Sequence, residues 1–385
     1  MEERVKLSSI TLEGFKSFGK KQKIRFGDVT IFIGANGSGK SNVLSFFQMI
    51  EYMLAKKFVN YIATRGEASS FIFNGNINQS ILANIEYDFP IYKFDYDFEL
   101  TASDSGQFVF TREEIRFINK KDNNGFTHDL GTGQKEIELN KATGFSSSIR
   151  EVAGNGNITK AAVSTRLSKI RTYNFSDTKR DSQIRKSSLI DNNYSLNQDG
   201  GNLASLLYSL KNNENYVWHY NRIVEFVKMA YPQFKDFILE PQKLNPNIIW
   251  LNWQDQHSPP SYSMSVHQLS DGTLRFIALA TLLLSPTDEL PSVIVLDEPE
   301  LGLHPTAIQL LSAMITLASE NNQVIIATQS SHLLDSFEPE NIRVVERDKD
   351  GNSTVIEQDP ESLAEWMETY SLGQIWEKNI MGGRP

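Results

Sequence analysis

The chain has 385 residues, a formal net charge of −9 at pH 7 and no cysteine. Its composition, 40% hydrophobic and 22% charged, is ordinary for a globular protein with a sizeable core. The lack of cysteine excludes disulfides, zinc–thiolate sites and cysteine nucleophiles. The longest apolar run, residues 276–284, is about half of the ~18 residues that span a bilayer, so we expect a cytoplasmic protein with no membrane partner. The acidic balance argues against a dedicated non-specific nucleic-acid binder but leaves a local basic face open.

Alternating apolar residues predict strands in the first third of the chain, at residues 5–15, 24–26, 29–33 and in an antiparallel meander over 81–118. A helix is expected at 41–57, directly after the buried strand at 29–33. Ile137 and Leu139 suggest one further strand. The start of the chain is therefore predicted to be a β-rich lobe with one long helix.

Between the strand at 29–33 and this helix, the sequence reads G-x-x-x-x-G-K-S. Strand, glycine-rich loop and helix in this order are the context of a phosphate-binding loop, or Walker A motif. The glycines let the backbone turn its N–H groups toward a phosphate, and the helix N-terminus adds its positive dipole end. Lys40 can reach the β- and γ-phosphates of ATP, and the Ser41 hydroxyl can bind Mg²⁺. The expected nucleotide-binding residues are Gly34, Asn36, Gly37, Ser38, Gly39, Lys40, Ser41 and Asn42.

The middle of the chain, residues 142–202, is rich in Ser, Asn, Lys and Arg. Helical periodicity then predicts helices at 203–210, 216–230, 271–284, 306–321 and 331–337. Apolar runs predict strands at 292–296, 324–328, 342–346 and 353–357. Helices and strands that alternate in this way indicate an α/β fold.

The buried strand at 292–296 ends in two carboxylates, Asp297 and Glu298. Its β-branched run is typical of a parallel strand that is buried on both faces. Ligands of α/β proteins bind at the carboxyl edge of such strands. Asp297 therefore fits the Walker B role of holding Mg²⁺, directly or through water, and Glu298 fits the general base that polarises the attacking water.

Upstream of this strand, the sequence L-S-D-G-T at 269–273 precedes a long apolar helix. Ser270 is expected to cap the helix N-terminus, and Gly272 marks a close approach. Taken alone, the stretch is an ordinary junction between a loop and a helix. Its place before the Walker B strand makes it similar to the L-S-G-G-Q signature of the ATP-binding-cassette (ABC) ATPases, with Asp271 and Thr273 at the third and fifth positions.

These motifs together resemble the ABC-type ATPases that include RecF, the structural-maintenance-of-chromosomes (SMC) ATPases and the OLD-type ATPases. The further similar stretches are G-F-K-S-F at 14–18, the D-loop region at 296–305 and the switch strand at 324–330. The closing residues 382–385 resemble small stand-alone, AAA_21-like ATPases of bacterial defence systems, which lack a Toprim nuclease domain. The resemblance implies an α/β ABC-ATPase head, a P-loop NTPase. The alternation at 81–118 adds an antiparallel β subdomain, and the helical periodicity adds a mostly helical insertion at 142–240. Its expected segments are 1–141 (first half of the head), 142–240 (insertion) and 241–385 (second half of the head).

The resemblance also implies a mechanism, in which two heads form a homodimer around ATP and Mg²⁺. Walker A and B come from one subunit and the signature from the other, so Ser270 and Gly272 contact the γ-phosphate held by the partner's Lys40. The resemblance leaves undecided whether assemblies larger than a dimer form. The catalytic residues are then Lys40, Glu298 and Gln329. Gln329 stands where the family has a switch histidine, so either Gln329 replaces the switch or turnover is slow and ATP serves mainly as a dimer clamp.

Two functions follow from the resemblance. The first is regulation of a separate effector, a nuclease or toxin, in a bacterial anti-phage defence complex, since the stretch after the switch strand is too short for a Toprim domain. The second is a RecF-like DNA-repair clamp that binds DNA directly. A locally basic segment, 160–186, is either a nucleic-acid contact or a solvated or partner-binding face; its cations are Lys160, Arg166, Lys169, Arg171, Lys179, Arg180, Arg185 and Lys186. His304 is either a contact across the dimer or a helix N-terminal residue before Pro305.

Overall fold

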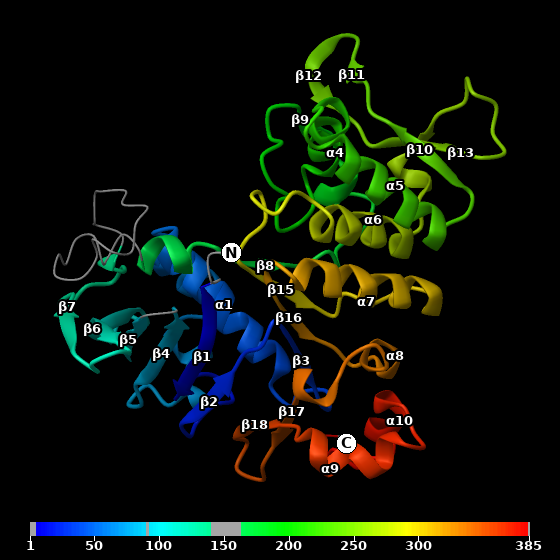
Figure 1. Cartoon of the computed structure of the whole chain (residues 1–385). Helices are drawn as coiled ribbons and strands as arrows, with labels where there is room; N and C mark the ends of the chain where they lie inside the picture. Colours follow the sequence, from blue (N-terminus) through cyan, green and yellow to red (C-terminus); the bar gives the residue numbers. More distant parts are fainter. Residues whose placement is uncertain (1–4, 90–91, 140–162, 384–385) are drawn as a thin grey trace. The chain divides into compact units, whose positions relative to one another are not determined.

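A computed structural model describes residues 5–89, 92–139 and 163–383. The chain divides into two compact units. Figure 1 labels the helices and strands of the chain. Unit 1 holds residues 1–171, 340–359 and 379–385, and unit 2 holds residues 172–339 and 360–378. The chain thus passes from unit 1 to unit 2 and back twice, and neither unit is one continuous segment.

Unit 1 contains a six-stranded sheet in the order β2-β1-β4-β5-β6-β7, in which every neighbouring pair is antiparallel. The strands are β1 (Lys6–Glu13), β2 (Gln22–Arg25), β4 (Ile81–Asp88), β5 (Tyr92–Ala102), β6 (Phe108–Asn119) and β7 (Gly125–Asp129). The meander predicted over 81–118 is therefore confirmed as three consecutive antiparallel strands. Its apolar alternation arises because one face of the sheet is buried.

Three further strands of unit 1 carry the phosphate-binding loop. β3 (Val29–Ile33) is buried along its whole length and pairs in parallel with β17 (Ile342–Arg347). β17 pairs in turn with the antiparallel β18 (Ser353–Glu357). The burial of β3 on both faces explains why four of its five residues are apolar and why Thr30 is buried as well.

Helix α1 (Lys40–Leu54) supplies the centre of the core of unit 1. The Phe46 ring is fully buried, lies 5.7 Å from the Phe15 ring and stacks at 6.3 Å on Phe98 of β5. Phe47 packs at 5.7 Å against Phe26. These contacts hold α1 on the apolar face of the antiparallel sheet. The helical segments of unit 1 are α1 (Lys40–Leu54), α2 (Phe58–Thr64) and two 3₁₀ turns, Ala68–Ser70 and Phe73–Gly75.

The strand predicted around Ile137 and Leu139 is wrong, although both side chains are buried. A buried carboxylate explains the difference. Glu113 on β6 accepts hydrogen bonds from the Glu138 N–H at 3.1 Å and from the Gln134 side-chain amide at 2.9 Å. The Glu113 side chain thus accepts a backbone hydrogen bond that this segment would otherwise make with a neighbouring strand. Burial raises the pKa of Glu113.

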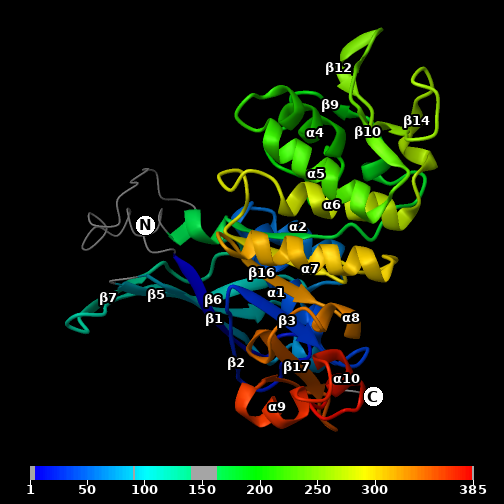
Figure 2. The same ribbon diagram turned by 45° about the vertical axis from the view of Figure 1, so that its right-hand side comes forward.

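Unit 2 contains a parallel pair of buried strands, β15 (Val293–Asp297) and β16 (Gln323–Ala327). Four helices pack against one another in succession, as Figure 2 shows: α4 (Leu203–Asn212), α5 (Val217–Ala230), α6 (Asp271–Leu283) and α7 (Pro305–Ser319). α7 also packs on β16. The apolar helix predicted at 271–284 is thus confirmed as an inner helix of this stack.

The other elements of unit 2 are short. Its small sheets, β10-β13-β14 and β11-β12-β9, comprise β9 (Ser188–Leu189), β10 (Phe234–Ile238), β11 (Pro241–Gln242), β12 (Asn245–Ile249), β13 (Asn252–Asp255) and β14 (Met264–Ser265). Its short helices are α8 (Ser331–Leu334), α9 (Pro360–Met367), α10 (Leu372–Glu377) and the 3₁₀ turns Gln183–Arg185 and Val266–Gln268. The chain passes between the units within β8 (Ile170–Tyr173), at the 3₁₀ turn Pro339–Asn341, and again after residues 359 and 378.

The insertion predicted at 142–240 is helical at α4 and α5, as the periodicity indicates. Residues 174–202 form mainly turns and loops instead. Residues 142–162, with Lys160, lie outside the described residues, and the segment boundaries at 141 and 240 stay a prediction. No helix in the described part of the chain is long and apolar enough to cross a membrane.

The burial of Phe46 leads to a test of the core of unit 1. Phe46→Ala removes a ring that contacts Phe15, Phe47 and Phe98. We expect the free energy of unfolding to fall by about 3–5 kcal/mol, the range for buried aromatic side chains, as measured by urea unfolding followed by circular dichroism. Phe46→Leu keeps an apolar side chain and should lose less than half as much. An unchanged midpoint for Phe46→Ala would contradict the packing.

Candidate nucleotide-binding and hydrolysis site

The phosphate-binding loop of unit 1 has a backbone that requires glycine. Gly34, Gly37 and Gly39 have φ angles of 151°, 77° and 118°, a region that side chains with a Cβ rarely adopt. A Cβ on Gly34 would also lie 2.2 Å from the carbonyl oxygen of Val345 on β17. Glycine is therefore required at position 34 both by the backbone conformation of the turn and by the close contact with β17.

Lys40 begins α1 and folds back onto this loop. Its ammonium group donates hydrogen bonds to the carbonyl oxygens of Gly34 at 2.7 Å and Ala35 at 3.0 Å. The residue is only 5% exposed, so these bonds hold it against the loop. Asn36 and Gly37 form an exposed tip. The geometry matches a P-loop whose lysine is available to the phosphates that enter the loop.

A hydroxyl cluster that the sequence did not predict supports the loop. The Oγ of Ser353 on β18 lies 2.7 Å from Ser17 Oγ and also hydrogen-bonds to the Ser38 carbonyl oxygen. Asn42, expected to bind nucleotide, donates its side-chain amide to Ser17 Oγ at 2.7 Å. A Cβ on Gly39 would lie 2.3 Å from Ser353 Oγ. The stretch G-F-K-S-F around Ser17 was the only signal for this support, and nothing in the sequence around Ser353 indicated it.

In unit 2, strand β15 ends at the carboxylates predicted for hydrolysis. Asp297 lies opposite Ala327 of β16, at the carboxyl edge of the parallel pair. Glu298 has a φ of 44°, and its N–H donates to the Ala327 carbonyl at 2.8 Å. Gln329 Nε2 donates to Glu298 Oε1 at 2.6 Å. Two residues that are 31 positions apart in the sequence thus form a pair.

This pair has a clear chemical consequence. An amide N–H is a neutral donor that cannot titrate, so Gln329 orients the Glu298 carboxylate without changing its own charge. An oriented carboxylate at the end of a buried strand can act as a general base toward a water molecule. Histidine at position 329 would add a titratable group instead.

Glu300 is a third carboxylate in the same stretch, and its contacts were not predicted. Its Oε1 accepts the Thr328 hydroxyl at 2.5 Å and the Gln329 N–H at 3.4 Å. Burial raises the pKa of Glu300. These bonds tie the segment that follows β15 to the end of β16 and so help to place Glu298 and Gln329 together.

The signature residues lie at the start of α6 in unit 2. Ser270 is the exposed N-cap residue, and its Oγ accepts the Thr273 N–H at 3.1 Å, as predicted. A Cβ on Gly272 would lie 2.2 Å from the carbonyl oxygen of Gly302. Gly272 therefore has a role within its own chain, the close contact with the D-loop region. Contact of Ser270 and Gly272 with a nucleotide stays a prediction.

His304 is the N-cap residue of α7, and its Nδ1 accepts the Thr306 N–H at 3.4 Å. This contact supports the helix N-terminal alternative. The predicted site residues fall into two groups: residues 34–42 in unit 1, and Ser270, Gly272, Asp297, Glu298 and Gln329 in unit 2.

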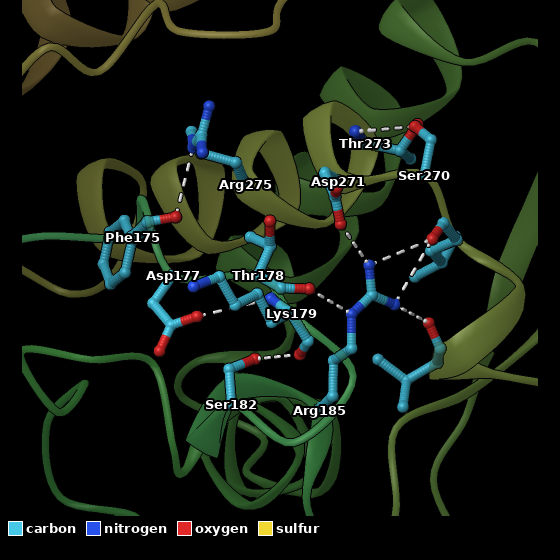
Figure 3. Close-up of polar contacts among 12 residues, drawn as sticks. Phe175, Asp177, Thr178, Lys179, Ser182, Arg185, Ser270, Asp271, Thr273 and Arg275 are labelled. Carbon is cyan, nitrogen blue, oxygen red and sulfur yellow. Dashed lines mark hydrogen bonds and ion pairs between the residues drawn. The ribbon is translucent and has the colours of Figure 1, made fainter.

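The basic segment 160–186 does not form one cationic face in its described part. The Arg185 side chain is 6% exposed, and its guanidinium group binds carbonyl oxygens and a carboxylate of unit 2 (Figure 3). Arg171 forms an ion pair with Glu51 at 3.9 Å in unit 1. At Arg185, neither alternative holds, because the side chain is buried and is exposed neither to nucleic acid nor to solvent or a partner. The sequence alone does not show whether a cationic side chain is buried or exposed.

The Gln329–Glu298 contact leads to a kinetic prediction. Gln329→Ala removes the donor, and we expect kcat to fall about tenfold to a hundredfold with little change in KM for ATP, as measured by phosphate release. Gln329→Glu puts two carboxylates in contact, which raises the pKa of the pair and should shift the pH profile of kcat upward. An unchanged kcat in Gln329→Ala would contradict the role of the contact.

The comparisons with known proteins agree with this geometry. The family profile AAA_21, described as "AAA domain, putative AbiEii toxin, Type IV TA system", matches residues 29–335. No curated protein sequence matches the chain. One similar solved structure is an SMC head bound to the C-terminal winged-helix domain of ScpA, with TM-score 0.53, 17% identity and coverage of 93% of this chain and 99% of that chain.

A second similar structure is the SMC head domain with an extended coiled coil, bound to the C-terminal domain of ScpA and derived from Pyrococcus furiosus. Its TM-score is 0.53 at 18% identity, with coverage of 94% of this chain and 99% of that chain. At this identity, the likeness concerns the fold. The predicted fold class, an α/β P-loop head of the ABC type with an antiparallel β lobe, is thereby confirmed. The chain belongs to the AAA_21 family of ATPases and has the fold of an SMC head.

Proposed function

We propose that this chain binds ATP with Mg²⁺ and hydrolyses it, with Glu298 as the general base. The observation that carries the proposal is the 2.6 Å hydrogen bond by which Gln329 orients the Glu298 carboxylate at the end of β15. The glycine-rich loop of unit 1 supplies the backbone and Lys40 for the phosphates. Lys40 binds the phosphates, Gln329 orients the Glu298 carboxylate, and Glu298 takes up the proton of the attacking water.

Mg²⁺ fits two residues of the chain. Ser41 is exposed on the first turn of α1, and Asp297 is half-buried at the end of β15. Hydroxyl and carboxylate oxygens are the ligands that Mg²⁺ prefers. When bound, the ion neutralises charge on the β- and γ-phosphates.

We further propose that two copies share each ATP. Ser270 is exposed, and the first turn of the 13-residue helix α6 carries N–H groups that suit a phosphate. The ATP on the P-loop of one copy would then meet Ser270 and the α6 N-terminus of the other. Hydrolysis removes the γ-phosphate from this shared site and opens the dimer, so that ATP controls assembly.

The dimer is proposed to regulate a separate effector, a nuclease or toxin, in bacterial anti-phage defence. The family description, which names a toxin of a type IV system, supports this link. The SMC heads in the comparison are bound to another protein, ScpA, which supports a fold suited to regulated assembly. The alternative of a RecF-like DNA clamp loses one of its supporting cations, because Arg185 is buried. ATP-dependent, salt-sensitive DNA binding would favour that alternative.

Two variants test the proposed ATPase. Lys40→Ala should abolish binding of a fluorescent ATP analogue, because it removes the cation that meets the phosphates. Glu298→Gln should keep binding but lower the rate of phosphate release by about a hundredfold or more. It should also accumulate an ATP-bound dimer, seen by light scattering with ATP and not with ADP. Lys235→Gln, on an exposed position of β10, is the control.

The outcomes separate the parts of the proposal. Normal turnover by Glu298→Gln would contradict its role as general base. A monomer at every ATP concentration in the same variant would contradict the shared site. Removal of Mg²⁺ by EDTA should stop turnover in the unaltered protein.

A further inference from the structure

The turn that carries Ser270 is held by one buried arginine, as Figure 3 shows. Arg185 Nη1 donates to the Val266 carbonyl at 2.6 Å, and Nη1 and Nη2 donate to the Leu269 carbonyl at 3.3 and 3.2 Å. Nη2 also donates to Asp271 Oδ1 at 2.7 Å. Leu269 and Asp271 are the residues on either side of Ser270. The guanidinium group therefore fixes the position of the backbone at Ser270.

The remaining donor of Arg185 ties the turn to a second loop. Nε donates to the Thr178 carbonyl at 2.6 Å. Five hydrogen bonds thus match the five N–H groups of a guanidinium. The side chain is 6% exposed, so these bonds face little competition from water. Lysine has neither the fork geometry nor the number of donors to replace them.

Arg275, one turn into α6, reaches the same loop. Its Nε and Nη2 donate to the carbonyl oxygens of Phe175 at 3.1 Å and Ser176 at 3.2 Å. Arg275 also lines a small pocket with Asp297 and Glu298. The loop 175–185 is therefore hydrogen-bonded to the start of α6 at two points. It also borders the pocket that Asp297 and Glu298 line.

We propose that Arg185 is a positioning residue that presents Ser270 and the α6 N-terminus to ATP bound by a second copy of the chain. This inference rests on the proposed shared site. A signature turn that is already in place before the nucleotide arrives need not be ordered in the transition state. The close contact of Gly272 with Gly302 limits movement of the helix start on another side. The hydrogen bond from Arg185 also lowers the pKa of Asp271, so the carboxylate in this contact stays charged to a lower pH than a free aspartate would.

Single variants give the first test. Arg185→Gln should leave the affinity for a fluorescent ATP analogue within about twofold and lower kcat by about tenfold to a hundredfold, as expected when a catalytic group is misplaced. Arg185→Lys keeps the charge but should be similarly defective. Asp271→Asn replaces the carboxylate acceptor of one of the five bonds by a neutral amide oxygen at an exposed side chain and should lower kcat only a few-fold. Lys235→Gln removes a cation from an exposed position in the same unit and should match the unaltered protein.

Mixing of variants gives the decisive test. In a heterodimer of Arg185→Gln with Glu298→Gln, one shared site combines an intact P-loop and base from the first chain with an intact signature from the second. Arg185→Gln alone should show its tenfold to hundredfold lower kcat, and Glu298→Gln alone a rate lower by about a hundredfold or more. The mixture, combined before ATP is added, should recover about a quarter of the unaltered activity, as expected for random pairing in a twofold dimer. Ser270→Arg mixed with Glu298→Gln is the matched control, because it blocks the signature directly.

The results distinguish this inference from the function on which it rests. If the Ser270→Arg mixture recovers activity and the Arg185→Gln mixture does not, Arg185 is not a positioning residue. If neither mixture recovers activity, the shared site itself is wrong. A folded Arg185→Gln with unaltered kcat would overturn the inference, with folding checked by thermal melting. If Arg185→Gln does not fold, the kcat of Asp271→Asn decides, and an unchanged value overturns the inference.

Discussion

At two glycines of the phosphate-binding loop, the space of a side chain is taken by another part of the chain, and the site depends on these contacts. A Cβ on Gly34 would meet the Val345 carbonyl, and one on Gly39 would meet the Ser353 hydroxyl. Both partners lie on the β17–β18 hairpin, and Ser353 is 315 positions from Ser38, which it contacts. The phosphate-binding loop near the start of the chain therefore needs a hairpin near its end. This dependence explains why unit 1 is assembled from separate segments.

Much of the site could be predicted because its signals are local. The glycine spacing of the P-loop, the carboxylates after an apolar strand and the N-cap serine before α6 each lie within about ten residues and follow from backbone geometry. Contacts between distant segments leave no such pattern. The Gln329–Glu298 pair and the support of the loop by Ser353 depend on how β-strands pair, which the sequence does not display. The strand expected at Ile137 failed for the same reason, since Glu113 on β6 binds the backbone there.

Arg185 shows how charge alone misleads. In the sequence it belongs to a run of cations near two aromatic residues, a composition that suits a phosphate-binding surface. In the structure its neighbours in the run, Lys179 and Lys186, are exposed, whereas Arg185 is buried and saturated with acceptors. A row of carbonyl oxygens at the turn before α6 requires a donor with several N–H groups, and arginine meets that need. The segment after β8 thus serves the signature turn.

Glutamine at position 329 has a consequence for where positive charge can come from. Histidine there could carry a charge beside the γ-phosphate, and its contribution would change near pH 6.5. Gln329 orients the Glu298 carboxylate through a hydrogen bond and adds no charge of its own. In the proposed dimer, positive potential at the γ-phosphate must then come from the bound Mg²⁺, from Lys40 and from the N-terminus of α6 of the second copy. The helix N-terminus acts only over its first turn, so its position must be held within a narrow range. A guanidinium group with five hydrogen bonds to the turn and its neighbouring loop is suited to hold it there.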